Sequence, residues 1–245
     1  MYRNTRFDEL MKGFSRPSFD KIVKEHKSDK YSKGFKSWDQ LIAMIYTQVS
    51  GCRSLREVET GFNSQTLHHY HLGTRSIKRS TLSDANANRD SEVFAQLCGQ
   101  LLDQMGRTVR NEIKDLLYLI DSTSITLKGL GFNDWTKENK NNHTQGIKVH
   151  IMTEQSQSIP IYVSITAANI NDIEDGRKIP IEAGATYVFD KGYYDYNWWY
   201  RIHKRDAFFV SRFKHNAATN TIKAFNCGSD NSEDILEDSL VEFKN

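Results

Sequence analysis

The chain of 245 residues is 38% hydrophobic, enough for a sizeable core, and carries 33 basic and 31 acidic side chains. No apolar run approaches the 18 residues of a membrane span, and the three cysteines lie far apart without a CxxC pair, which argues against a zinc framework and a disulfide scaffold. We therefore expect a soluble cytoplasmic protein with reduced thiols and no membrane partner.

Helical periodicity marks the first part of the chain. Apolar residues recur at helical spacing through "SWDQLIAMIYTQVSG" (37–51), and Ser54 with Glu57 forms a capping-box pattern that opens a second helix. Another amphipathic stripe follows in "SEVFAQLCGQLLDQM" (91–105). Residues 1–110 carry 18 basic and 12 acidic side chains, whereas the remaining 135 carry 15 and 19. We predict a small all-α domain at 1–110 whose positive charge favours a polyanion partner.

Strand patterns dominate residues 111–245. Continuous or alternating apolar runs bounded by turn residues predict five strands, and two stretches between them predict helices. The strands are expected at 115–121, 146–154, 159–167, 186–190 and 207–213, and the helices at 171–184 and 196–206. This order predicts an α/β domain with a mixed sheet and helices on its faces.

Two of these strands end in an acid, in "LYLID" and "TYVFD". If the two strands are neighbours in one sheet, Asp121 and Asp190 emerge within reach of a shared ion. Mg²⁺ prefers oxygen ligands and needs only one or two protein carboxylates when phosphate oxygens complete its shell. The alternative is that each Asp caps the element that follows it, a common role for an acid at a strand end.

Consecutive segments resemble landmarks of the DDE transposases of bacterial insertion sequences, in the group with D-S-T and D-[KR]-G-Y signatures. In chain order these segments are "LIDSTSITL", "GIKVHIMTE", "ANINDIEDG", "VFDKGYYDYNWW" and "FFVSRFKHN". The front part is also similar, through "SWDQLIAMIYTQVSGCRSLREVE" and "KRSTLSDANANRD". The resemblance covers nearly the whole chain, and the order of its motifs makes it specific.

The resemblance implies a ribonuclease-H-like catalytic domain at 111–245. In that family two Asp and one Glu bind Mg²⁺, with Mn²⁺ as a possible substitute, for DNA strand cleavage and transfer. Asp121 and Asp190 match the two Asp. The Glu belongs to a pattern Y-x₂-R-x₃-E-x₆-K, and Glu237 and Glu242 lack its Tyr, Arg and Lys. We therefore expect the front portion of a transposase, ending before the third acid and impaired in strand transfer.

The segment "KRSTLSDANANR" has the composition of a DNA-recognition helix. Lys78, Arg79 and Arg89 are candidate phosphate contacts, and Asn86 is a candidate base contact. The alternative is a solvated basic helix that links the two domains.

Three further basic residues are candidate DNA contacts. Arg53 and Arg56 follow the first predicted helix, and surface salt bridges to nearby glutamates are the alternative. Lys191 directly follows Asp190 and either contacts a DNA phosphate or neutralises that carboxylate.

The leading hypothesis is a DNA transposase of an insertion sequence. It would bind double-stranded DNA at the element ends and in the target, act as a homodimer in the active complex, and reside in the bacterial cytoplasm and on the nucleoid. The runner-up is a non-catalytic DNA-binding remnant or inhibitor of transposition. A third alternative is an unrelated metal-dependent nuclease of the same fold, which would cleave without preference for element ends.

Overall fold

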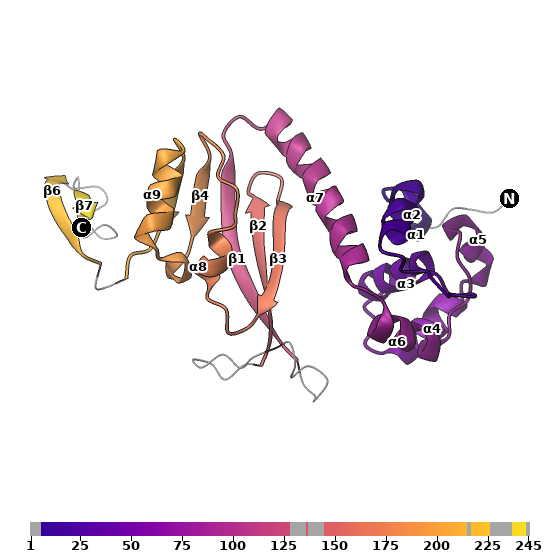
Figure 1. Cartoon of the computed structure of the whole chain (residues 1–245). Coiled ribbons are helices and arrows are strands. Elements are labelled where there is room, and N and C mark those ends of the chain that lie inside the picture. Colours follow the sequence, from indigo (N-terminus) through magenta and orange to yellow (C-terminus); the bar gives the residue numbers. More distant parts are fainter. Residues whose placement is uncertain (1–5, 128–135, 137–144, 215–216, 226–236, 244–245) are drawn as a thin grey trace. The chain divides into compact units, whose positions relative to one another are not determined.

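The computed structural model describes residues 6–127, 136, 145–214, 217–225 and 237–243. The chain divides into two compact units, 1–104 and 105–245, and each is described below by itself. The division falls within the long helix α7 (Glu92–Glu112) (Figure 1). In the described parts of the chain, no helix is both long enough and apolar enough to cross a bilayer.

The first unit is built from helices. Its further elements are α1 (Arg6–Met11), α2 (Arg16–Glu25), α3 (Ser37–Val49), α4 (Leu55–Asn63), the 3₁₀ turn η1 (Thr66–His68), α5 (His69–Leu72) and α6 (Arg79–Asn88).

Local capping signals set where α3 ends and α4 begins. Gly51 follows α3 with a φ of 65°, a left-handed conformation that favours glycine. The Ser54 side chain accepts a hydrogen bond from the Glu57 backbone N–H at 3.2 Å, and Glu57 accepts one from the Arg53 N–H at 2.8 Å. The helix pair predicted from the sequence is therefore confirmed.

Apolar side chains from the helices α1 to α7 and from Ile77, in the loop before α6, form the core of this unit. Phe19 stands near its centre and packs against Trp38 and Phe94, with ring centroids 5.8 and 6.2 Å away. The buried members are Met11, Phe19, Ile22, Val23, Trp38, Leu41, Ile42, Ala43, Val58, Phe62, Leu72, Ile77, Leu82, Val93 and Leu97.

The second unit is a mixed α/β structure. Its strands are β1 (Leu117–Thr126), β2 (Gly146–Glu154), β3 (Ile159–Ala167), β4 (Thr186–Phe189), β5 (Phe208–Ser211), β6 (Thr219–Phe225) and β7 (Asp238–Phe243). Between them lie α8 (Asp172–Gly176), the 3₁₀ turn η3 (Lys191–Tyr193) and α9 (Tyr196–Lys204).

The main sheet has the strand order β3-β2-β1-β4-β5 (Figure 1). The strands β1, β2 and β3 pair antiparallel, as successive strands of a meander do. The strands β4 and β5 add on the other side of β1 and run parallel to it, after crossovers that contain α8 and α9. This mixed sheet with helices confirms the ribonuclease-H-like fold class expected for this part of the chain.

Aromatic residues hold α9 against the sheet. Phe189 at the end of β4 lies 4.8 Å from the Trp198 ring, and Trp199 stacks on Phe209 of β5 at 5.0 Å. The buried core of the unit consists of Tyr118, Ile120, Met152, Ile179, Ile181, Ala185, Tyr187, Phe189, Tyr193, Trp198, Trp199, Ile202 and Ala207.

The structure corrects several element boundaries. The strand predicted at 115–121 runs on to Thr126, because the residues after Asp121 continue to pair with β2. The helix predicted at 171–184 is only the five residues of α8. Pro180 disfavours a helical conformation at Ile179, and the chain leaves the helix through a turn and a bend, with Ile179 and Ile181 both buried. The antiparallel hairpin of β6 and β7 was not predicted.

Candidate active site

The carboxylates of Asp121 and Asp190 come from neighbouring parallel strands. Ile120 of β1 pairs with Phe189 of β4, so the acid that follows each of them stands at the same level of the sheet. Both acids are exposed. Asp121 does not end its strand as predicted, but it lies where pairing with β4 stops and only β2 continues beside β1. The sheet topology therefore brings the two predicted acids to one place.

Each of the two carboxylates has one oxygen held by the backbone. Asp121 Oδ1 accepts a hydrogen bond from the Ser122 N–H at 2.8 Å, and Asp190 Oδ1 accepts one from the Gly192 N–H at 2.7 Å. The Oδ2 atom of each makes no hydrogen bond or ion pair with the described residues. Asp190 also caps η3, as the alternative interpretation expected. Capping uses only one of its oxygens, so the other oxygen stays free to bind a ligand.

Gly192 allows a third carboxylate to approach this pair. A Cβ atom at this position would lie 2.9 Å from Asp190 Oδ1 and 2.8 Å from Asp172 Oδ2. Such distances are below van der Waals contact, so a side chain here would displace one or both carboxylates, and glycine permits their close approach.

Asp172, the first residue of α8, is held by two side chains, Ser122 and Lys148, and a third, His150, lies near it beyond hydrogen-bond distance. Its Oδ1 accepts a hydrogen bond from Ser122 Oγ at 2.7 Å and lies 3.0 Å from Lys148 Nζ and 3.8 Å from His150 Nδ1. Lys148 is only 7% exposed and His150 only 1%. Burial lowers the pKa of His150 below its usual value, while the charges of Asp175 and Asp172 oppose that shift.

Sequence reasoning did not place Asp172 and Lys148 in the site. Lys148 and His150 alternate with apolar residues along β2, so both side chains point to one face of the sheet. A lysine and a histidine at alternate positions of a buried strand were the available signal, since such groups are rarely buried without partners.

Tyr193 in η3 is buried at 1% exposure, and its hydroxyl has no hydrogen-bond partner among the described residues. Burial raises the pKa of Tyr193 well above its usual value, and the negative charges of Asp172, Asp121, Asp175 and Asp190 raise it further. The hydroxyl therefore keeps its proton and faces a region of negative charge.

The donor set suits a hard divalent cation. Two carboxylates with free oxygens are the ligands that Mg²⁺ takes together with waters or phosphate oxygens. Over the described residues, no group of three or more His, Cys, Asp or Glu side chains converges closely enough to enclose a metal ion. A cation here would therefore depend on Asp121 and Asp190 and on oxygen atoms that do not belong to the described protein.

Four of the predicted DNA contacts gather at the beginnings of α4 and α6. Arg53, Arg56, Lys78 and Arg79 are all exposed, and their side chains form no ion pair with any described residue. The salt bridges considered for Arg53 and Arg56 are thus not formed there. A groove of about 560 Å³ runs between the two helix beginnings and is lined by Ser54, Leu55, Arg56, Arg79, Ser80 and Ser83.

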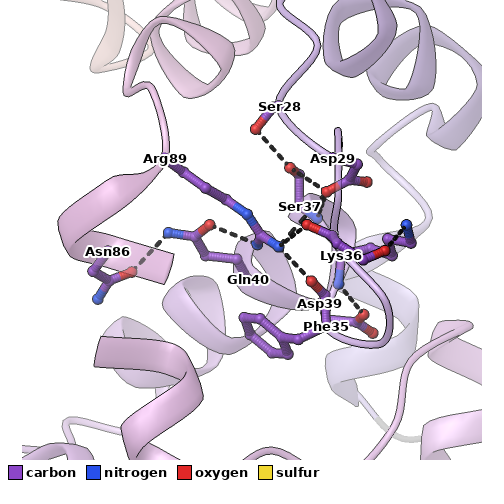
Figure 2. A network of polar contacts seen from close by, with 10 residues as sticks. Ser28, Asp29, Phe35, Lys36, Ser37, Asp39, Gln40, Asn86 and Arg89 are labelled. Carbon is purple, nitrogen blue, oxygen red and sulfur yellow. Dashed lines mark hydrogen bonds and ion pairs between the residues drawn. The ribbon is translucent and has the colours of Figure 1, made fainter. Parts of the chain in front are cut away.

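Arg89, by contrast, points into the protein. Figure 2 shows its guanidinium between the loop before α3 and the start of that helix. It donates to Gln40 Oε1 at 3.0 Å and to the carbonyl of Phe35, and lies 3.7 Å from Asp29. Its side chain is only 10% exposed. This position differs from the exposed phosphate contact that the sequence suggested, because internal acceptors hold its donors.

Asn86 and Lys191 are both exposed. Asn86 Oδ1 accepts a hydrogen bond from Gln40 Nε2 at 2.7 Å, which joins it to the network around Arg89 (Figure 2). Lys191 is the first residue of η3 and forms no ion pair with Asp190 or any other described residue. Its charge therefore stays available next to the carboxylates.

Comparison with known proteins places two family models on the chain. The model described as "Transposase DDE domain" matches residues 112–240. A domain of unknown function (DUF4372) matches residues 2–75.

One curated relative is the Sinorhizobium fredii (strain NBRC 101917 / NGR234) protein named "Putative transposase y4zB". It is 44% identical over 142 residues, which cover 58% of this chain and 39% of the relative, so this chain matches well under half of the relative's length. Among solved structures, a cryo-EM structure of the piggyBac transposase synaptic complex with hairpin DNA aligns at 12% identity with a TM-score of 0.46. That alignment covers 86% of this chain and 50% of the other, and adds nothing to the family assignment.

Proposed function

Because the chain belongs to the family of the transposase DDE domain, we propose that it is a DNA transposase of an insertion sequence. In this proposal it binds the element ends and catalyses metal-dependent strand cleavage and transfer. One observation carries the catalytic part. Asp121 and Asp190 stand at the same level of adjacent parallel strands, each with one oxygen fixed by a backbone N–H and one without a partner.

Asp121 and Asp190 would hold Mg²⁺, or Mn²⁺ in its place. Two carboxylates this close in register repel one another, and a cation removes that penalty. When bound, the ion would activate water and stabilise charge on the phosphodiester. The protein's own part is to fix the two carboxylates through the Ser122 and Gly192 N–H groups, so that they need little rearrangement on binding. Lys191, exposed beside Asp190, would contact a phosphate of the DNA strand.

The helical unit would bind DNA through the groove between α4 and α6. Arg56 and Arg79 line it, and Arg53 and Lys78 precede the two helices. Each helix begins there with backbone N–H groups and the positive end of its dipole, which favour phosphate. The exposed amide nitrogen of Asn86 makes no hydrogen bond with the described residues, so it would be free for a base edge. For Arg89 we now propose a structural role.

The third acid of the family pattern is not assigned to any residue of this chain. We therefore propose that the chain binds DNA and a divalent cation more readily than it transfers strands, and that the active complex is a homodimer. The non-catalytic DNA-binding protein remains the second candidate because only two acids match the pattern.

The test uses the full 245-residue chain and a supercoiled plasmid that carries the ends of the encoding element. With Mg²⁺ or Mn²⁺ we expect nicking at the element ends. We expect Asp121→Asn or Asp190→Asn to reduce it at least about a hundredfold, since a lost metal ligand removes several kcal/mol of transition-state stabilisation. Asp115→Asn, an exposed acid outside the site, is the matched control and should nick normally.

The same preparation separates the two candidates. Salt-sensitive binding to the element ends without nicking would favour the non-catalytic DNA-binding protein. Nicking that the two Asp→Asn variants leave intact would overturn the assignment of the metal site. Nicking without preference for element ends would instead favour the third alternative, a general nuclease.

A further inference from the structure

Asp172 is connected to both carboxylates of the proposed metal site. Ser122 joins it to Asp121, because the Ser122 N–H donates to Asp121 Oδ1 while its Oγ donates to Asp172 Oδ1. On the other side, Asp172 Oδ2 and Asp190 Oδ1 both lie within 3 Å of the position that a Cβ of Gly192 would take, at 2.8 and 2.9 Å. A substitution at Asp172 would therefore alter the surroundings of both Asp121 and Asp190.

Among the described residues, Lys148 is the cationic side chain that contacts Asp172. Its Nζ lies 3.0 Å from Asp172 Oδ1 and donates to the carbonyl of Ile170 at 2.8 Å. At 7% exposure this ammonium is shielded poorly by water, so its charge acts strongly on its surroundings. The charge of Asp172 offsets it, and the pair leaves the two negative charges of Asp121 and Asp190 to face a cation.

Two buried polar atoms point to a ligand beside these acids. The Tyr193 hydroxyl and His150 Nδ1 belong to side chains that are each 1% exposed, and neither atom has a hydrogen-bond partner among the described residues. A buried donor without an acceptor costs free energy. The charges of Asp172, Asp121, Asp175 and Asp190 all raise the pKa of Tyr193, so its hydroxyl keeps its proton and could donate it to an oxygen atom of a ligand held beside these acids.

Asp172 itself is poorly suited to be a metal ligand. Its charge is already compensated by the ion pair with Lys148, whereas Asp121 and Asp190 form no ion pair with the described residues, and no three acids or histidines converge within the described part of the chain. Successive side chains of a strand point to opposite faces, so Ser122 and Asp121 leave β1 in opposite directions. The influence of Asp172 on Asp121 must therefore pass through the Ser122 backbone and through charge.

We propose that Asp172 is a positioning residue of the cation site, and that the Asp172–Lys148 pair sets the net charge that the site presents to the ion. Asp172 fixes Ser122, which in turn fixes Asp121, and its charge cancels that of Lys148. The inference rests on the proposed metal site at Asp121 and Asp190. It predicts opposite effects for the two members of the pair, which a purely structural ion pair would not produce.

The experiment titrates the full chain with Mn²⁺ in the absence of DNA and measures free Mn²⁺ by electron paramagnetic resonance. We expect Asp172→Asn to weaken binding about tenfold or more, as partners of metal ligands typically do when removed. Lys148→Met should strengthen binding several-fold, because it removes a buried positive charge, and the double variant should return close to the wild type. Lys178→Met, which removes an exposed lysine near the buried Asp175, is the control and should change little.

Weaker binding in both single variants, or no change in either, would overturn the proposal, because either result indicates a merely structural pair. If Asp172→Asn does not fold, Lys148→Met alone decides, together with Ser122→Ala, which removes the hydrogen bond but no charge and should weaken binding modestly. Mn²⁺ binding that survives Asp121→Asn and Asp190→Asn would refute the proposed metal site itself. Loss of binding in those two variants with no effect of Asp172→Asn or Lys148→Met would refute only the role of the pair.

Discussion

In the helical unit the side chain of Arg89 is only 10% exposed, and its guanidinium is bonded to Gln40, the Phe35 carbonyl and Asp29 (Figure 2). In the sheet unit Asp121 and Asp190 are exposed, and each keeps an oxygen without a partner. All three were selected from the sequence as functional charges. Arg89 differs from the two acids in its surroundings. A charged group whose hydrogen bonds are satisfied within the protein has little capacity left for a ligand. The comparison favours a structural role for Arg89 and supports the proposed ligand role of the two acids.

The largest expected effect on stability is at Arg89. We expect Arg89→Met to lower the free energy of unfolding of the helical unit by about 3 kcal/mol, because it leaves Asp29 and the Phe35 carbonyl without their buried partner. Arg89→Lys should recover only part of this loss, since an ammonium does not reproduce the planar fork of the guanidinium. Urea unfolding measures both variants. An unchanged midpoint for Arg89→Met, relative to the exposed control Arg75→Met, would remove the distinction between the two regions.

A substitution at Gly192 should have the next largest effect. Gly192→Ala places a methyl group against Asp172 and Asp190, and we expect a loss of about 1–3 kcal/mol as η3 shifts to relieve the overlap. Because the shift moves Asp190, Mn²⁺ binding should weaken as well. Gly99→Ala is the control, since a Cβ there meets no neighbouring atom within 4 Å and alanine favours a helix. A Gly192→Ala variant with normal stability and normal Mn²⁺ binding would contradict the close approach of the three acids.

For Asp121→Asn we expect the opposite sign of effect on stability. The variant keeps an oxygen for the Ser122 N–H and removes repulsion from the neighbouring acids, so the free energy of unfolding should stay equal or rise by up to about 1 kcal/mol at low salt. Thermal unfolding at low and high salt checks this. A clear loss of stability would mean that the carboxylate has a structural partner, and the site would then resemble the Arg89 network.

The smallest expected change in stability is at the groove between α4 and α6. Arg56→Ala and Arg79→Ala should each alter the free energy of unfolding by less than about 0.5 kcal/mol, as exposed side chains without partners do. Each should nevertheless weaken DNA binding and reduce the slope of log affinity against log salt by about 1. Fluorescence anisotropy over a range of salt measures both quantities. Arg107→Ala, an exposed arginine of α7, is the control, and an equal loss there would indicate nonspecific charge rather than a groove.

Local patterns in the sequence determined much of the secondary structure. The strands β2 and β3 occupy the residues that alternation predicted, and α3 ends and α4 begins at the predicted capping signals. These patterns suffice because capping and alternation act between residues close in sequence. They also identified Asp121 and Asp190, whose motifs lie at recognisable strand positions.

Tertiary structure decided which side chains share an environment. The low exposure of Arg89 depends on acceptors near residue 35, more than 50 positions away. A pattern of residues close in sequence cannot predict such a contact. Asp172 and Lys148 meet near Asp121 only because α8 packs against a face of the sheet formed by β1 and β2. The continuation of β1 beyond Asp121 likewise depends on its pairing with β2. Such contacts join distant segments, so the sequence by itself singled out the two acids of the proposed site, and only the fold decided what surrounds them.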